Sequence, residues 1–207
     1  MSTSSLDRLP LRERKKLKTR RAIQEHALRL FAAHGYDATT VEQIAEAAEI
    51  SPSTFFRYFP TKEDVVVTDE YDPLMEAMYR ERAADEDPVE GLREMFQTAL
   101  GEMIVGPDRD RLLARVKLIQ SVPALRARAW DIQQQGSHGI LIELLSERLG
   151  RDRNDFQVQL FVGALIGMIS TISYYWADGD GAEDLGELFR RGFDLLQAGF
   201  PLAAQEG

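Results

Sequence analysis

The sequence predicts an all-α fold, with an N-terminal head of three helices joined to a larger helical body and about nine helices in all. Apolar residues recur at intervals of three and four along most of the chain. Helix-start and helix-stop residues bound these stretches, and no segment shows the convincing period of two that marks a strand. With 207 residues, 44% of them apolar and 29% charged, the chain is long enough to bury a sizeable core.

The head begins with a long helix. Its apolar spacing predicts a helix over about residues 11–34, with Gly35 as its stop signal. Thr40 stands three residues before Gln43, and this capping-box pattern predicts the start of a short second helix over about residues 41–47.

A third helix is predicted after a tight turn. Ser51 suits its N-cap and Pro52 its first position, where the missing N–H of proline costs nothing, and the helix ends before Pro60. We expect a fourth helix to begin at the cap Thr61 and to continue to about residue 84, with Pro73 as the place for a kink.

The remaining chain is predicted to form five helices between breaks that contain proline or glycine. They lie roughly over residues 89–105, 108–121, 123–149, 155–178 and 182–199. The chain is therefore expected to divide into a head over residues 1–62 and a body over residues 63–207.

Charge is distributed unevenly between these two parts. The chain has a net charge of −9, but residues 1–62 carry 11 Lys and Arg against 7 Asp and Glu, whereas residues 63–207 carry 14 against 27. Most of the positive excess of the head lies between Arg8 and Arg21. Such a terminal run is typical of arms that bind polyanions, and it also suits a solvated helix face, so charge alone leaves both interpretations open.

The second and third helices of the head form a helix-turn-helix pattern. In that motif the second helix enters the major groove of DNA. Phe55 and Phe59 lie one turn apart and are predicted to face the core of the head. The residues then left facing outward are Ser53, Thr54, Arg57 and Tyr58. Hydroxyl and guanidinium groups contact base edges and phosphates in DNA complexes. The alternative, a helix-turn-helix with a purely structural role, would not explain these exposed groups next to a basic arm.

The stretch from Thr19 to Val66, TRRAIQEHALRLFAAHGYDATTVEQIAEAAEISPSTFFRYFPTKEDVV, resembles the DNA-binding head of the tetracycline-repressor (TetR) family of bacterial regulators. The pieces LF-x-x-x-GY, TTV-x-x-IA-x-x-A and F-x-x-F/Y-F-x-x-KE stand at the spacings of that family. The resemblance implies that the DNA-contacting positions are Thr40, Ser51, Pro52, Ser53, Thr54, Phe56, Arg57, Tyr58 and Lys62. The sequence departs from the usual pattern in having Glu49 for a turn glycine, Ser53 for a glycine, Phe56 for a tyrosine and Tyr58 for a histidine.

Beyond the head, the resemblance implies a homodimer that binds a palindromic double-stranded DNA operator and releases it when a small molecule enters the body. The body is also similar to a subgroup with an acyl-CoA-like ligand-binding domain. The last two helices supply candidates for the dimer interface, although the same residues would suit ordinary core positions, and Gly163-x-x-x-Gly167 would let two helices approach closely. These candidates are Phe161, Leu165, Met168, Ile172, Phe189 and Phe193.

For the effector, we expect an apolar cavity with a few orienting polar groups and a small apolar or amphipathic ligand. The candidate lining residues are Trp130, Gln134, His138, Ser170 and Tyr174. A single histidine such as His138 is more often a structural residue than a ligand-binding one.

Other classes of protein are disfavoured. The absence of cysteine excludes disulfides and thiolate metal sites, and the sequence has no recognisable nucleophile, phosphate-loop or metal-ligand motif, so we expect neither an enzyme nor a cofactor. Residues 156–177 carry no charge and are long enough to cross a bilayer, but their polar residues favour a buried helix, and we expect a cytoplasmic protein without a membrane partner. A DNA-binding regulator without a ligand remains an alternative, and so does an all-helical enzyme.

Overall fold

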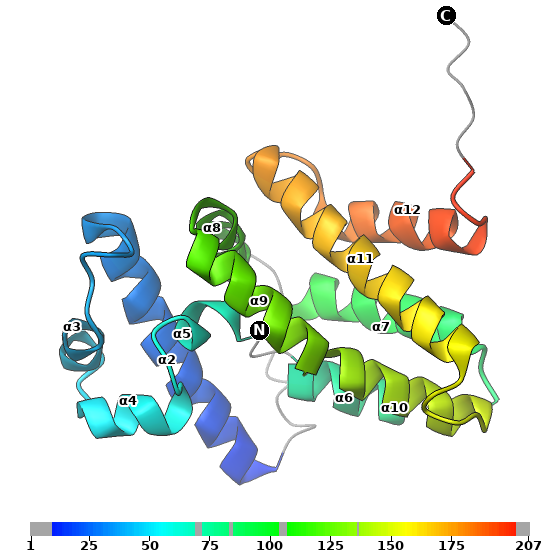
Figure 1. Cartoon of the computed structure of the whole chain (residues 1–207), viewed down its shortest axis with the longest axis horizontal. Helices are drawn as coiled ribbons and strands as arrows, with labels where there is room; N and C mark the ends of the chain where they lie inside the picture. The colour runs from blue at the N-terminus through cyan, green and yellow to red at the C-terminus, as the bar shows by residue number, and fades with distance from the viewer. Residues whose placement is uncertain (1–9, 69–71, 83–84, 104–106, 136, 202–207) are drawn as a thin grey trace, which may run out of the picture.

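The computed structural model describes residues 10–68, 72–82, 85–103, 107–135 and 137–201. These residues form eleven helices and no strand, which confirms the all-α prediction (Figure 1). The number of helices exceeds the nine predicted ones by two, because the chain breaks at Thr68 within the predicted fourth helix and because two helices are described on either side of residue 136.

The three helices of the head lie where the local signals place them. They are α2 (Leu11–His34), α3 (Val41–Ala47) and α4 (Pro52–Tyr58). At the start of α3, Thr40 Oγ1 accepts a hydrogen bond from the backbone N–H of Gln43, and Gln43 Oε1 accepts one from the N–H of Thr40. This reciprocal capping box satisfies two of the N–H groups that a helix start leaves unpaired.

The predicted fourth helix is broken. The chain forms α5 (Asp64–Val67), leaves helical geometry at Thr68, and forms α6 (Asp72–Arg80) after it. The Thr68 carbonyl accepts hydrogen bonds from Gln24 Nε2 at 3.0 Å and Arg115 Nη1 at 3.4 Å. The continuous helix was therefore a wrong prediction, because side chains from α2 and α8 bind the carbonyl at the break.

The body contains six further helices: α7 (Pro88–Met103), α8 (Pro107–Ser121), α9 (Pro123–Gln135), α10 (Ser137–Leu149), α11 (Phe156–Asp178) and α12 (Leu185–Gln197). The residues predicted as a single helix over 123–149 are helical on both sides of residue 136, as α9 and α10. Residue 136, between them, lies outside the described residues.

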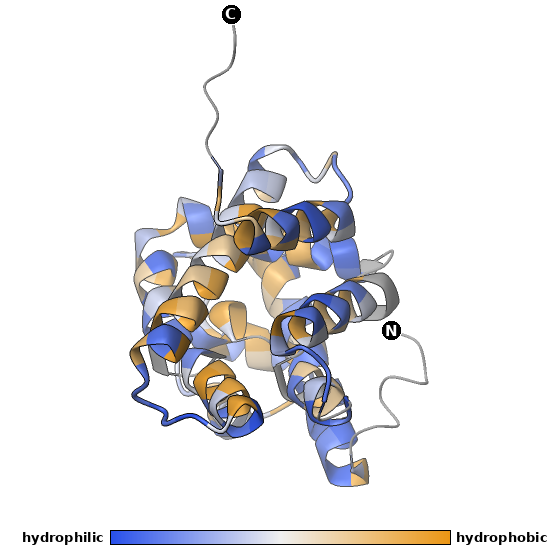
Figure 2. Ribbon diagram, turned by 90° about the vertical axis from the view of Figure 1, so that its right-hand side faces the viewer, coloured by the Kyte–Doolittle hydropathy of each residue, from blue (hydrophilic) through white to orange (hydrophobic). Residues whose placement is uncertain are grey.

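Two apolar clusters form the interior. One joins side chains of α2 to α5 and includes Ile119 of α8 and Leu125 of α9, so the packing of the head extends past residue 62 into the body. The other joins α6, α7, α8, α10, α11 and α12. Figure 2 shows that hydrophobic residues are spread along the body helices, on facing sides and also on outer sides.

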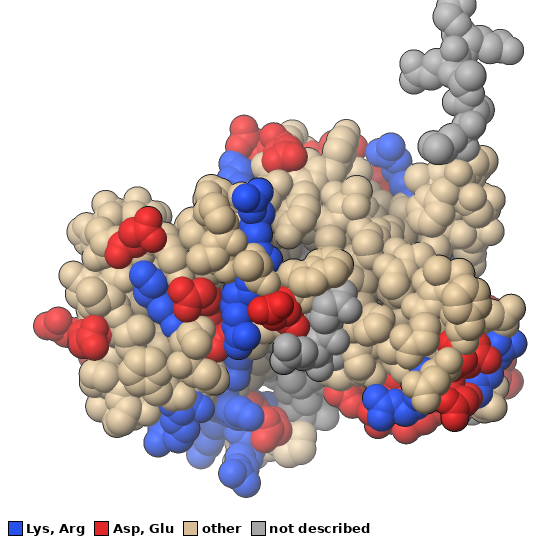
Figure 3. Space-filling model, in the orientation of Figure 1, with Lys and Arg blue, Asp and Glu red and all other residues tan. Residues whose placement is uncertain are grey.

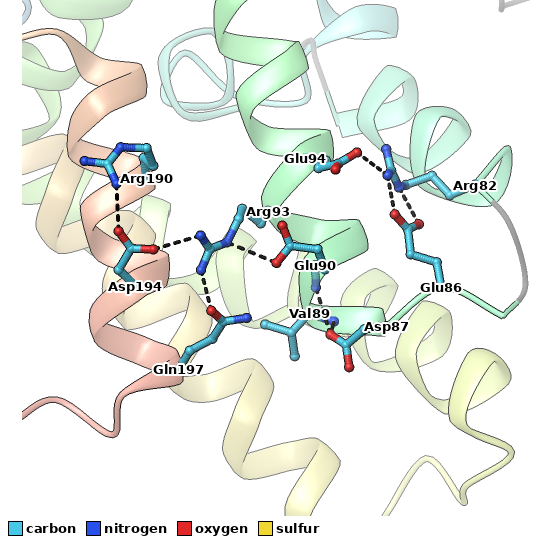
Figure 4. Close-up of polar contacts among 10 residues, drawn as sticks. All are labelled: Arg82, Glu86, Asp87, Val89, Glu90, Arg93, Glu94, Arg190, Asp194 and Gln197. Atoms are coloured by element: carbon cyan, nitrogen blue, oxygen red, sulfur yellow. Dashed lines mark hydrogen bonds and ion pairs between the residues drawn. The ribbon is translucent and has the colours of Figure 1, made fainter.

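The last helix is held against α7 by both apolar and ionic contacts. The rings of Phe96 and Phe189 stack with centroids 5.4 Å apart. At the surface, Arg93 of α7 donates to Asp194 of α12 at 2.8 Å and also to Gln197 (Figure 4). The core contact contributes most of the stability, since exposed ion pairs are individually weak.

The turn between α3 and α4 has a left-handed residue. Glu49, which stands where the TetR pattern has glycine, adopts a φ of +55°. A residue with a Cβ is disfavoured in this region by about 1–2 kcal/mol. The turn therefore forms with glutamate, but at a cost in stability.

We predict that Glu49→Gly raises the free energy of unfolding by about 0.5–1 kcal/mol, because relief of this strain exceeds the entropic cost of glycine. The control is Glu46→Gly within α3, which should lower it by about 1 kcal/mol. Urea denaturation followed by far-UV circular dichroism measures both. A Glu49→Gly chain no more stable than the wild type would contradict the prediction.

Candidate nucleic-acid interface

The recognition helix α4 has one buried face and one exposed face. Phe55 and Phe59 are fully buried, as predicted from their spacing. The exposed residues are Ser51, Pro52, Ser53, Phe56 and Arg57, and Thr54 and Tyr58 are half-buried. Tyr58 packs against the core of the head, so it is less outward than the sequence predicted.

The start of α4 is organised around one hydroxyl group. Ser51 Oγ accepts a hydrogen bond from the N–H of Thr54 at 3.1 Å. It also lies 2.9 Å from both Ser53 Oγ and Thr54 Oγ1. Ser51 is thus the N-cap of α4, and it holds the hydroxyls of Ser53 and Thr54 together at the exposed start of the helix.

Lys62 lies beside the start of α3. Its ammonium donates to the carbonyls of Tyr36 at 3.0 Å and Thr39 at 3.1 Å, and it lies 4.1 Å from the centroid of the Tyr36 ring. A lysine ammonium has three N–H donors, so these carbonyls occupy two of them. The charge is fixed next to Thr40, where the backbone enters α3.

Tyr36 also fixes the residue after Lys62. Its hydroxyl donates to Glu63 Oε1 at 2.7 Å. Burial raises the pKa of the Glu63 carboxyl, but the hydrogen bonds from Tyr36, the backbone and Thr61, together with the charge of Lys62, outweigh burial and lower it below its usual value. Glu63 therefore stays ionised and keeps this loop in place at neutral pH.

The basic run of α2 divides into two groups. Arg12, Lys15, Lys16 and Lys18 are exposed. Figure 3 shows Lys and Arg side chains gathered over the N-terminal half of this helix. Arg20 and Arg21 instead bind within the chain: Arg20 donates to the carbonyl of Tyr58 at 3.2 Å, and Arg21 pairs with Asp108 of α8. Local sequence gave no signal that separates the two groups.

The residues predicted to line the effector site lie partly at the surface of the described part of the chain. Trp130 is 63% exposed, and Tyr174 is exposed as well. Ser170 and His138 are half-buried, and Ser170 Oγ accepts a hydrogen bond from Gln133 Nε2 at 2.9 Å. The side chain of Gln134 lies outside the described residues. Trp130 and Tyr174 thus lie at the surface of the single chain, and the lining of an effector site by these residues stays a prediction.

A small cavity instead lies where the head meets the body. Its volume is about 10 Å³, the space of one water molecule. It is lined by Gln24, Leu28, Val65, Asp108, Arg111, Leu112 and Arg115. This space is far below the size of an effector site.

The six residues predicted for the dimer interface pack inside the chain. Leu165, Met168, Phe189 and Phe193 are buried, and Phe161 and Ile172 are half-buried against the same cluster. A Cβ at Gly192 of α12 would lie 2.5 Å from Ile172 of α11, so these two helices pack closely within one chain. The four buried residues are therefore core residues of one chain, which was the alternative for these positions, whereas an interface role of Phe161 and Ile172 stays a prediction.

The opposite face of α11 is uncharged and open, and we call it the α11 stripe. Its exposed members are Phe156, Leu160, Gly163, Ala164, Gly167, Thr171, Tyr174 and Tyr175. A Cβ at Gly163 or Gly167 would meet no atom within 4 Å. By length and composition alone α11 could also cross a membrane, but its other face belongs to the body core.

A capped helix-turn-helix with hydroxyl and arginine groups exposed on its second helix, next to a basic helix, defines a DNA-binding protein. The model of bacterial regulatory proteins of the tetR family matches residues 23–67, and the MftR C-terminal domain matches residues 86–201. The chain belongs to the tetR family of bacterial regulators. It is therefore a DNA-binding transcription regulator and not an enzyme.

Individual relatives agree with this assignment. The chain is 34% identical over 197 residues to the HTH-type transcriptional regulator TcmR of Streptomyces glaucescens, covering 90% of this chain and 86% of that protein. It is 27% identical over 188 residues to the putative mycofactocin biosynthesis transcriptional regulator MftR of Mycobacterium tuberculosis, covering 90% and 93%. Among solved structures, the TetR-family repressor FadR of Thermus thermophilus in complex with lauroyl-CoA matches with a TM-score of 0.58, 27% identity and coverage of 91% and 98%.

We predict that Ser51→Ala lowers the free energy of unfolding by about 1 kcal/mol, because α4 loses its N-cap. Ser51→Asp should keep the stability, since aspartate caps equally well, but should weaken DNA binding at least tenfold through its negative charge. Urea denaturation and a fluorescence titration with labelled duplex DNA measure the two effects. Equal stability of the wild type and Ser51→Ala would show that the cap does not stabilise the head.

Proposed function

We propose that this protein is a cytoplasmic, ligand-responsive repressor that binds a palindromic operator as a homodimer. The observation that carries the proposal is the exposed face of α4, where Ser53 and Arg57 lie one turn apart, on a helix whose end is bound by Arg20 of the basic helix α2. In this proposal α4 lies in the major groove with Arg57 at a base edge or a phosphate. Thr40 and Lys62, which lie at the start of α3, contact the phosphate backbone in this proposal.

The α11 stripe supports the homodimer. It is an apolar face of one long helix, and its glycines allow a second helix to approach closely. A two-fold axis through this face pairs the stripe with its own copy, as a closed dimer requires. Two heads related by that axis match the two halves of a palindrome.

A small apolar or amphipathic effector is the second part of the proposal. The similarity to the lauroyl-CoA complex of FadR supports such a ligand in the body. The exposed positions of Trp130 and Tyr174 favour the alternative, a regulator without a ligand. Titrating lauroyl-CoA against a preformed DNA complex, with coenzyme A as the control, distinguishes the two, because only a ligand that prefers the DNA-free form releases DNA.

The DNA-binding face is tested with an operator selected from a random duplex library on the wild-type chain. We expect Arg57→Ala to weaken binding to this operator about 10- to 100-fold, the effect of one lost arginine contact. The control is Arg126→Ala, which removes an exposed arginine from α9 and should change affinity less than twofold. Equal affinities of Arg57→Ala and the wild type in a gel-shift titration would refute the assigned face.

The dimer face is tested with Leu160→Glu, which places a charge in the α11 stripe. We expect the dimer to dissociate at least tenfold more readily, because that carboxylate would be buried without a partner. Leu11 is a matched control, being 62% exposed where Leu160 is 61% exposed, and Leu11→Glu in the head should leave the dimer intact. Sedimentation velocity measures both, and an unchanged dimer in Leu160→Glu would exclude the stripe as the interface.

A further inference from the structure

The recognition helix ends with a carbonyl that cannot be paired within the helix. In a continuing helix this carbonyl, that of Tyr58, would accept from the N–H four residues later, but Phe59 is already extended, with φ −138° and ψ 106°, and the helix ends. The carbonyl of Tyr58 therefore needs a donor from elsewhere, since the last carbonyls of a helix have no intrahelical partner.

Arg20 of α2 supplies that donor. Its Nη1 donates to the Tyr58 carbonyl at 3.2 Å, and its guanidinium carbon lies 4.6 Å from the centroid of the Phe59 ring. Phe59 is fully buried in the head core. One side chain thus joins α2 both to the last carbonyl of α4 and to the aromatic ring that anchors the end of α4.

The chemistry of this contact suits arginine rather than lysine. A guanidinium is planar, lies flat on an aromatic ring and still directs N–H groups at a carbonyl in its plane, whereas an ammonium is a point charge. The positive charge also lies at the C-terminal end of α4, where the helix dipole favours it. Lys18, two residues earlier on α2, is exposed.

We propose that Arg20 is a positioning residue for DNA recognition. It holds the end of α4 against α2. The face of α4 that carries Ser53 and Arg57 and the exposed cations of α2 can then contact the same DNA duplex. The inference rests on the proposed binding of an operator by α4. It assigns to Arg20 an effect on sequence discrimination, which a phosphate-binding arginine would not have.

The test compares Arg20→Ala with Lys18→Ala, since each removes one positive charge from the same helix. The probes are the duplex selected on the wild-type chain and the same duplex with its sequence scrambled, each titrated at several salt concentrations. Lys18→Ala should weaken binding to both duplexes by the same factor and reduce the salt slope by about 1. Arg20→Ala should lower the ratio of selected to scrambled affinity at least tenfold, with a wild-type salt slope on scrambled DNA.

Arg20→Lys keeps the positive charge and is used if Arg20→Ala does not fold, which thermal unfolding followed by circular dichroism shows. We expect the ratio of selected to scrambled affinity of Arg20→Lys to fall several-fold, with a wild-type salt slope. A wild-type ratio in Arg20→Lys, or an Arg20→Ala chain that behaves like Lys18→Ala, would overturn the inference. If the wild type enriches no sequence from the library, the proposed operator binding itself fails, which is a different outcome.

Discussion

Two buried carboxylates, each paired with an arginine, hold α2 and α5 of the head cluster against α8 and α9. Asp64 of α5 is 2% exposed; one of its oxygens accepts from Arg128 of α9 at 2.7 Å and the other from the backbone N–H of Thr61 at 3.0 Å. Asp108 of α8 is 5% exposed and pairs with Arg21 of α2. Asp108 also pairs with Arg111 of its own helix at 3.4 Å. A buried charge that loses all its partners costs several kcal/mol, so these ion pairs oppose movement of the head against α8 and α9.

Because the two pairs end on α8 and α9, these two helices join the body to the head core. The apolar contacts of Ile119 and Leu125 with the head core reinforce this link. On its other side, α8 is bound to the turn between α11 and α12, where Gln120 donates to Asp178 at 3.0 Å and Lys117 pairs with Asp180. Helix α8 therefore links the end of α11 to the head. In the proposed dimer, this helix lies between the α11 stripe and the head of each chain.

The sequence predicted those parts of the fold and site that depend on neighbouring residues. The starts of α3 and α4 follow from cap residues within three positions of the N–H groups that they bind, so Thr40 and Ser51 were sufficient. The break at Thr68 was missed because its carbonyl is bound by Gln24 and Arg115, which are far away in the sequence. No local pattern encodes such a contact. Pro73 was the local signal for a kink in the predicted helix, but the helical geometry already ends at Thr68.

Residue type also left open which side chains face solvent. Leu160 and Leu165 lie on the same uncharged helix, yet one is 61% exposed and the other fully buried. The sequence assigned the buried face of α11 to the interface because an apolar helix shows two equivalent faces until its neighbours are placed. Lys18 and Arg20 differ in the same way, since both count as head cations while Arg20 binds the end of α4. The net positive charge of the head therefore exceeds the charge that is available to contact DNA. Under the proposed function, recognition of a DNA sequence depends also on how rigidly α4 is held, which a count of charges does not show.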